Sequence, residues 1–342
     1  MLDTVKKLCA LSGVTGWEDE VRDYILERAL PFADETETDA MGNLYIFKKG
    51  AVTPDKPVML CAHMDEVGVI VTGISDEGYL RFDFCGGVDR RVVLGKRVFI
   101  GPDAVPGVIG MKPVHLTTEE ERTGSVPKLD SLYIDICAEN ADMAKAKVKL
   151  GYRGVFDNNI YEFGEGYIKA KALDDRVGCA AMLKVLETDL PVDAWFVFSV
   201  QEEVGCRGAA VAASRVRPCF AIVLEGTTAA DMAGVGKGQE ICFLGKGIVI
   251  PFMDKGTIYD RNTWEFVTAC AEKNAIPWQT KTTVAGGTDA SAIQRRGLGA
   301  RVITMSAPLR NIHSPASVGK ISDLEAMPVM CSALLRELAN GF

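Results

Sequence analysis

The chain has 342 residues, of which 48% are hydrophobic and 25% charged, and a net charge of −8 at pH 7. This composition is that of ordinary globular proteins, and the length favours two domains over a single core. The negative charge argues against nucleic acid or an anionic membrane as a partner, because both require clustered positive charge. No apolar stretch of about 18 residues is present, so we expect no membrane span.

Ten cysteines are present, and no two of them have the C-x-x-C spacing of common metal-binding or redox motifs. Most lie within apolar stretches, which favours reduced, buried thiols over a disulfide framework. The first residues lack a basic start followed by a long apolar run, so we expect no secretory signal. These features together predict a cytoplasmic protein.

The first elements along the chain have α/β character. Residues 15–18 read Thr-Gly-Trp-Glu and fit a capping box, and apolar residues at helical spacing follow them. A helix is therefore predicted over about 17–29. Strands are predicted at 44–47 and 58–62, and the apolar character of the second indicates that it is buried.

The pattern changes after Gly68. Residues 69–165 are dense in glycine and β-branched side chains, and they contain short alternating runs with one short helix near 141–150. Residues 117–128 are polar and are predicted to form a loop. Short strands at this spacing predict a small β-barrel or sandwich.

The α/β pattern returns from Tyr167. Residues 194–200 form a continuous apolar run, as expected of a strand in a sheet that is covered on both faces. A second strand is predicted at 220–224. Helices are predicted at 175–186, 209–215, 257–274 and 326–338.

These elements predict two domains and an α/β fold class. Residues 1–68 and 166–342 are expected to form one discontinuous domain, a mixed sheet flanked by helices. Residues 69–165 are expected to form an inserted, barrel-like β domain.

Five short segments carry acids or histidines, and three of them directly follow an apolar strand-like run. The carboxyl ends of strands are where open α/β sheets place their chemistry. His63 and Asp65 stand two apart at the end of a strand, so both side chains project to one face if the extended geometry persists. Asp65 can then accept a hydrogen bond from the ring nitrogen that does not bind metal, which orients the imidazole. The alternative is a solvated strand-end turn.

Glu202 and Glu203 follow the run at 194–200. Adjacent residues of an extended chain point in opposite directions, so one should bind metal and the other should face an attacking water. We assign Glu202 as the general base and Glu203 as a ligand, because a partly desolvated carboxylate beside a dication can reach a pKa near neutrality. An isolated pair of this kind is otherwise an exposed acidic turn.

Asp174 opens a helix, where a carboxylate is also favourable as a simple N-cap. Glu225 ends the strand at 220–224, and a carboxylate there is costly unless it is paired, bound to metal or exposed to water. His313 precedes Ser314 and Pro315 in a stiff turn. The predicted centre holds one metal by His63, Asp174 and Glu225, and a second by Asp174, Glu203 and His313. Oxygen and imidazole ligands suit zinc, cobalt or manganese.

Two further features are less specific. Gly287, Thr288 and Asp289 lie in a glycine turn that opens a helix, and its backbone donors could hold a substrate. A plain strand–helix connection capped by Asp289 is an equal alternative. His115, in the inserted region, is interpreted as a structural or surface histidine.

As a set, these segments resemble the M42 family of metallo-aminopeptidases. The resemblance is carried by residues 63–68 (His-Met-Asp-Glu-Val-Gly), 172–176 (Ala-Leu-Asp-Asp-Arg), 201–205 (Gln-Glu-Glu-Val-Gly), 286–290 (Gly-Gly-Thr-Asp-Ala) and 313–315 (His-Ser-Pro). It implies a zinc-peptidase α/β domain, an inserted dimerisation domain and homo-oligomers built from dimers, including dodecamers.

The function expected from the sequence is therefore a cytoplasmic aminopeptidase with two divalent metal ions, acting on oligopeptides with Glu202 as the general base. Two alternatives remain open. One is a metal-dependent N-acyl amino acid deacylase, and the other is a non-catalytic, shell-forming binding protein.

Overall fold

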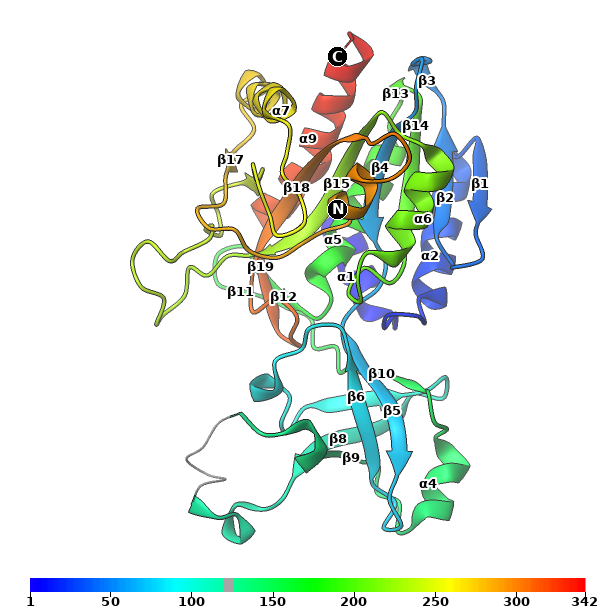
Figure 1. Ribbon diagram of the computed structural model, residues 1–342, viewed down its shortest axis with the longest axis vertical. Coiled ribbons are helices and arrows are strands. Elements are labelled where there is room, and N and C mark those ends of the chain that lie inside the picture. Colours follow the sequence, from blue (N-terminus) through cyan, green and yellow to red (C-terminus); the bar gives the residue numbers. More distant parts are fainter. Residues whose placement is uncertain (120–125, 342) are drawn as a thin grey trace.

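The computed structural model describes residues 1–119 and 126–341. It shows an α/β body with a β-barrel beneath it (Figure 1). Half of the polar loop expected at 117–128, residues 120–125, lies outside the described residues. Within the described residues, no helix is long and apolar enough to span a membrane.

The body is built on an 11-stranded mixed sheet. Its four central strands are parallel neighbours in the order β14, β4, β15 and β18. All six residues of β4 are buried, which explains why its sequence is apolar up to its last residue, His63. The strands of this sheet are β1 (Glu35–Thr38), β2 (Leu44–Lys48), β14 (Ala194–Ser199), β4 (Val58–His63), β15 (Phe220–Thr228), β18 (Arg301–Arg310), β19 (Ser317–Lys320), β12 (Tyr167–Ala170), β11 (Tyr161–Phe163), β16 (Ile248–Val249) and β17 (Trp278–Gln279).

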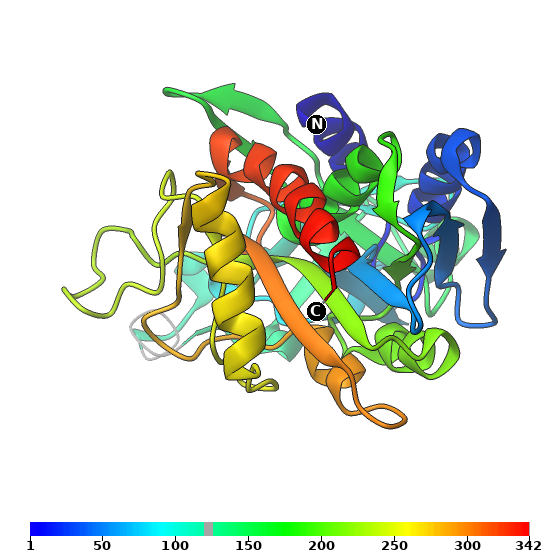
Figure 2. The ribbon, with the colours of Figure 1, turned by 90° about the horizontal axis from the view of Figure 1, so that it is seen from above.

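Helices cover both faces of this sheet (Figure 2). Helices α5 and α9 pack against each other and against the central strands from one side, while α6 and α8 pack together on the other. A two-stranded sheet of β3 (Gly50–Val52) and β13 (Leu190–Val192) lies beside the body. The body's helices are α1 (Leu2–Ala10), α2 (Asp19–Ala29), α5 (Leu173–Leu186), α6 (Arg207–Val216), α7 (Arg261–Lys273), α8 (Ala290–Gln294) and α9 (Ile321–Ala339).

The inserted region forms a closed barrel with a hydrophobic core of its own. The expected α/β fold with a barrel-like insertion is therefore confirmed. The barrel strands, in order around the barrel, are β10 (Arg153–Phe156), β5 (Gly68–Ile74), β6 (Leu80–Cys85), β9 (Leu132–Asp135), β8 (Val105–Met111) and β7 (Arg97–Ile100), with helix α4 (Ala141–Lys147) outside them.

The pairing of strands indicates where the inserted domain ends. Strand β11 at Tyr161–Phe163, which the boundary at residue 165 assigns to the insertion, pairs with β12 in the large sheet. We propose that the inserted domain ends after β10, near residue 157, and that it mediates dimerisation.

Two helix starts differ from expectation for local reasons. Helix α2 begins at Asp19, and no capping box forms, because the Thr15 hydroxyl donates to the buried Asp65 carboxylate at 2.8 Å instead of accepting from the helix. Helix α5 begins at Leu173, but Asp174 and Asp175 have non-helical backbone angles. That irregularity turns the Asp174 carboxylate toward the end of the sheet.

A buried ion cluster ties the N-terminal helix to this region. Both oxygens of Glu66 accept from the Lys171 ammonium, at 2.6 and 2.7 Å, and one accepts from Arg176 at 3.1 Å. The Arg176 guanidinium also donates to the carbonyls of Met64 and Leu8. The cluster thus joins α1, α5 and the segment after β4.

We predict that Lys171→Met destabilises the protein by about 3 kcal/mol. Removing one partner of a buried ion pair costs about 3–5 kcal/mol, and the low end applies here because Arg176 remains beside Glu66. Guanidinium denaturation of the metal-free protein measures the loss. The control is Lys6→Met, which removes an exposed pair with Glu162 and should leave the denaturation midpoint unchanged. Equal midpoints for the two variants would contradict the prediction.

Candidate metal centre

The carboxyl edge of the parallel strands gathers the predicted ligands. His63 is the last residue of β4, and its partner across the sheet is Ser199, the last residue of β14. Glu203 follows shortly after β14, and Glu225 lies on β15 next to β4. Asp174 enters from the irregular start of α5, and His313 enters from the turn after β18. Segments far apart in the sequence meet because parallel strands end at one edge.

The Asp174 carboxylate lies between the two imidazoles. Its Oδ1 is 3.4 Å from His63 Nε2, and its Oδ2 is 3.5 Å from His313 Nε2. His63 Nε2 is also 3.5 Å from Glu225 Oε2, and His313 Nε2 is 3.4 Å from Glu203 Oε2. The five residues therefore form two triads that share one carboxylate.

These spacings match those of ligand atoms around a common ion. Zinc bonds of about 2.0–2.1 Å at tetrahedral angles place neighbouring ligand atoms about 3.3–3.4 Å apart. His63 Nε2 is buried and has no hydrogen-bond partner among the described residues, although carboxylate oxygens surround it. A cation satisfies such an arrangement of nitrogen and oxygen lone pairs, so the residues fit a pair of divalent metals.

Backbone carbonyls orient both rings. His63 Nδ1 is 3.1 Å from the Asp65 carbonyl oxygen, and His313 Nδ1 is 3.2 Å from the Gly87 carbonyl oxygen in the barrel. Donation from Nδ1–H to these oxygens leaves each Nε2 lone pair directed at the centre. The sequence predicts that the Asp65 carboxylate orients His63. Instead, the main-chain oxygen of Asp65 is the nearer acceptor, and its carboxylate Oδ1 lies 3.4 Å from His63 Nδ1.

Burial raises the pKa of the acids that face at most one imidazole, whereas Asp174 faces two. Burial raises the pKa of Glu225 to about 8 and that of Glu203 to about 7, although His63 and His313 oppose the respective shifts. Burial and the charge of Glu225 also hold the pKa of Glu202 well above its usual range. Clustered carboxylates of this kind attract positive charge.

The centre raises the pKa values of its two imidazoles, whereas burial alone would lower them. Burial alone would lower the pKa of His313, but the facing Asp174 and Glu203 carboxylates raise it to about 9. Likewise, burial would raise the pKa of Asp174, but His313 and His63 bring it below its ordinary value. The field that favours protons on these rings also favours dications between them.

Comparison with known proteins identifies the family. Residues 42–330 match the family model described as M42 glutamyl aminopeptidase. The chain belongs to the M42 family of aminopeptidases. The lysyl aminopeptidase of Pyrococcus furiosus is 31% identical over 343 residues, covering 98% of this chain and 97% of that protein. The resemblance found in the sequence is thereby confirmed, and the protein is a peptide hydrolase.

Solved structures agree with the fold of this M42 aminopeptidase. An aminopeptidase from the archaeon Desulfurococcus kamchatkensis is 36% identical with a TM-score of 0.92, covering 98% of this chain and 94% of that one. The Pyrococcus horikoshii TET1 peptidase, which can assemble into a tetrahedron or a large octahedral shell, is 34% identical with a TM-score of 0.87. That match covers 98% of this chain and 99% of the TET1 chain.

In this M42 aminopeptidase, two carboxylates hold the loop that carries Glu202. Asp65 accepts from the backbone N–H groups of Glu202 and Glu203, at 3.0 and 3.2 Å. Glu18 accepts from the N–H of Gln201 at 3.3 Å, and Thr15 completes the set by donating to Asp65 at 2.8 Å. Three consecutive N–H groups are thus fixed by side chains from the N-terminal segment and the end of β4.

Thr15 and Glu18 are contributors to this loop that the sequence does not reveal. Their spacing predicts a helix cap, and no local pattern distinguishes a cap from a long-range contact. Burial and the neighbouring Asp65 charge raise the pKa of Glu18 to about 7. The loop itself bends sharply, because Gln201 has a left-handed φ of 57°.

The proposed substrate turn divides into exposed and buried parts. Gly287 is exposed, whereas Thr288 and Asp289 are buried. The Asp289 carboxylate accepts from Ser199 at 2.5 Å, and its backbone N–H donates to Glu225 at 3.4 Å. Asp289 precedes α8 but makes no side-chain cap. It therefore contacts the metal centre rather than acting as a simple helix cap.

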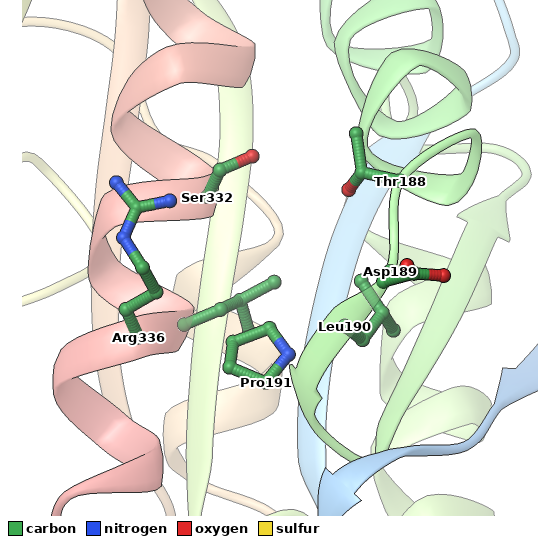
Figure 3. Close-up of a pocket in the computed structure, with 7 residues that line it drawn as sticks. Thr188, Asp189, Leu190, Pro191, Ser332 and Arg336 are labelled. Carbon is green, nitrogen blue, oxygen red and sulfur yellow. The ribbon is translucent and has the colours of Figure 1, made fainter.

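The remaining candidates lie elsewhere. His115 is exposed in the short 3-10 helix Val114–Leu116 of the inserted region. A hollow of about 280 Å³ opens between α9 and the segment before β14 (Figure 3). The hollow is lined by residues of α9 and by residues that come before β14 in the chain, whereas the metal centre lies past the end of β14. None of the predicted site residues lines the hollow. Its lining residues are Thr188, Asp189, Leu190, Pro191, Ser332, Leu335 and Arg336.

We predict that Thr15→Val lowers the aminopeptidase kcat between about tenfold and a hundredfold, because the loop carries Glu202, the general base expected from the sequence, and small displacements of a reacting group have effects of this size. Valine keeps the volume but cannot donate to Asp65, so the loop loses one of its restraints. KM and metal content should change little. Thr15→Ser restores the donor and should restore kcat, and a serine variant as slow as the valine variant would exclude this role.

Proposed function

We propose that the chain is a dinuclear metal aminopeptidase that releases N-terminal residues from oligopeptides. The observation that carries the proposal is the position of Asp174, whose two oxygens each face a different imidazole Nε2 at 3.4 and 3.5 Å. A carboxylate in this position can bridge two cations. Membership of an aminopeptidase family supports the reaction type.

In this proposal, His63, Asp174 and Glu225 hold one metal, and Asp174, Glu203 and His313 hold the other. Zinc fits this ligand set best, and cobalt or manganese are alternatives. When bound, two such cations supply Lewis acidity that polarises a scissile carbonyl and lowers the pKa of water.

Glu202 is the proton carrier in this scheme. Its side chain belongs to neither ligand triad, and burial with the neighbouring Glu225 charge keeps its pKa well above the usual range. Such a carboxylate can accept a proton from the attacking water and return it to the leaving amine. The hydrogen bonds from the backbone to Asp65 and Glu18 position its loop.

The substrate class is tested with matched peptides. The metal-loaded protein should hydrolyse aminoacyl-anilides and oligopeptides with a free N-terminus, and it should not hydrolyse the N-acetylated forms. Release of acyl groups from N-acyl amino acids would instead support the deacylase alternative. Tight metal binding without turnover of any substrate would support the non-catalytic alternative.

We further propose that the chain forms homo-oligomers built from dimers, including dodecameric shells. The dodecamer and the shells formed by TET1 relatives support this, as do exposed apolar side chains on the barrel (Val114, Leu116) and on the body (Phe252, Ile258, Leu298). The ten free cysteines are consistent with a reducing compartment such as the cytoplasm.

Glu202→Gln should reduce turnover by a factor of about 10²–10⁴, the usual contribution of a general base. Both metals should remain, because the residue is not a ligand in the proposal. Elemental analysis together with single-turnover kinetics measures the two effects separately. Glu203→Gln is the contrasting variant and should lose metal as well as activity. If the metal content of Glu202→Gln fell in parallel with its activity, the two roles would have to be exchanged.

His313→Ala should reduce the metal content from two ions to one per chain at limiting free metal. The reason is that the triad on the Glu203 side loses its only imidazole, while His63 continues to serve the other triad. His115→Ala is the matched control, since it removes an exposed histidine of the inserted region and should retain both ions. Unchanged stoichiometry in His313→Ala would remove His313 from the ligand set.

A further inference from the structure

A third group of ligand-type side chains lies beside the two triads. It consists of Glu202, Cys206 and Asp289, whose ligand atoms lie within 4.8 Å of one another. Cys206 immediately precedes α6, and Asp289 immediately precedes α8. Because α6 and α8 pack together, the two side chains approach Glu202 from the same side of the sheet.

The hydrogen bonds within this group leave acceptor capacity unused. The Cys206 thiol donates to Glu202 Oε1 at 3.3 Å. Asp289 Oδ2 accepts from Ser199, but Asp289 Oδ1 has no partner in the described part of the chain, and the residue is only 1% exposed. An unpaired carboxylate oxygen at such depth is costly, and a bound cation would satisfy it.

The donor set determines which cation fits. Sulfur is a soft ligand that selects zinc and its heavier congener cadmium, whereas magnesium and calcium prefer oxygen alone. Two carboxylates and one thiolate supply three ligands and leave a fourth position for water. This differs from both triads, in which nitrogen and oxygen are the only ligand atoms.

We propose that Glu202, Cys206 and Asp289 form a third, inhibitory site for a soft divalent cation such as Zn²⁺. Binding forms a bond from the cation to Cys206 Sγ, and the thiol proton leaves to solvent. The bound cation also engages the Glu202 carboxylate, which then cannot accept a proton from water. The inhibitory effect rests on the proposed function of Glu202, whereas the binding site itself does not.

Two measurements on the metal-loaded enzyme test this site. In the first, Zn²⁺ is added beyond the two catalytic equivalents, and activity is expressed relative to each variant's own rate before addition. The wild type should lose activity, and Cys206→Ala should require about tenfold or more additional Zn²⁺ for the same loss. In the second, Cd²⁺ is added and the ultraviolet thiolate-to-cadmium charge-transfer absorption is recorded.

Cys219→Ala is the matched control, since Cys219 is also a half-buried free cysteine but contacts the Lys56 carbonyl far from the centre. It should behave as the wild type in both measurements. The proposal is overturned if Cys206→Ala and the wild type are inhibited at the same Zn²⁺ concentration, or if their Cd²⁺ absorption is identical. If no variant shows aminopeptidase activity, the proposed function fails, and the absorption difference alone decides whether the site exists.

Discussion

The whole centre depends on how the fold keeps several carboxylates buried in one place. Each of them would be costly without a partner, since burial penalises the charged form. Asp65 is satisfied by backbone N–H groups and Thr15, and Asp174 by two imidazoles. Glu225 faces the His63 imidazole, and Glu203 faces the His313 imidazole. The carboxylate oxygens and imidazole nitrogens of the centre still have lone pairs that cations can accept. These unused lone pairs define the chemistry of the site.

The parallel sheet makes this concentration of charge possible. Strands β4 and β15 run side by side through the core, so their apolar stretches stabilise the fold while their ends deliver polar residues to one edge. The buried cluster around Glu66 fixes the chain after β4, and the irregular start of α5 brings in Asp174. The apolar parts of these strands thus stabilise the fold, and the polar residues at their ends help to form the site.

Much of this arrangement was predictable from the sequence, for a physical reason. A polar residue at or just after the end of an apolar strand is conspicuous, so His63, Glu203 and Glu225 are candidates by position, and together with Asp174 and His313 they predict a metal centre. The contributions of Thr15, Glu18 and Gly87 could not be predicted, because each depends on a contact between segments distant in the chain. The boundary of the insertion was also difficult, since β11 is a short strand that closely follows the last barrel strand in the sequence but pairs with β12.

The hydrogen bond between His313 and the Gly87 carbonyl has a structural consequence beyond the ring it orients. Gly87 belongs to the loop after β6 of the barrel, whereas His313 follows β18 of the body. Any rotation of one unit against the other alters the angle at which this imidazole meets its carboxylate partners. The position of the barrel therefore bears directly on the geometry of the site, because one of its backbone carbonyls sets how His313 faces Asp174 and Glu203.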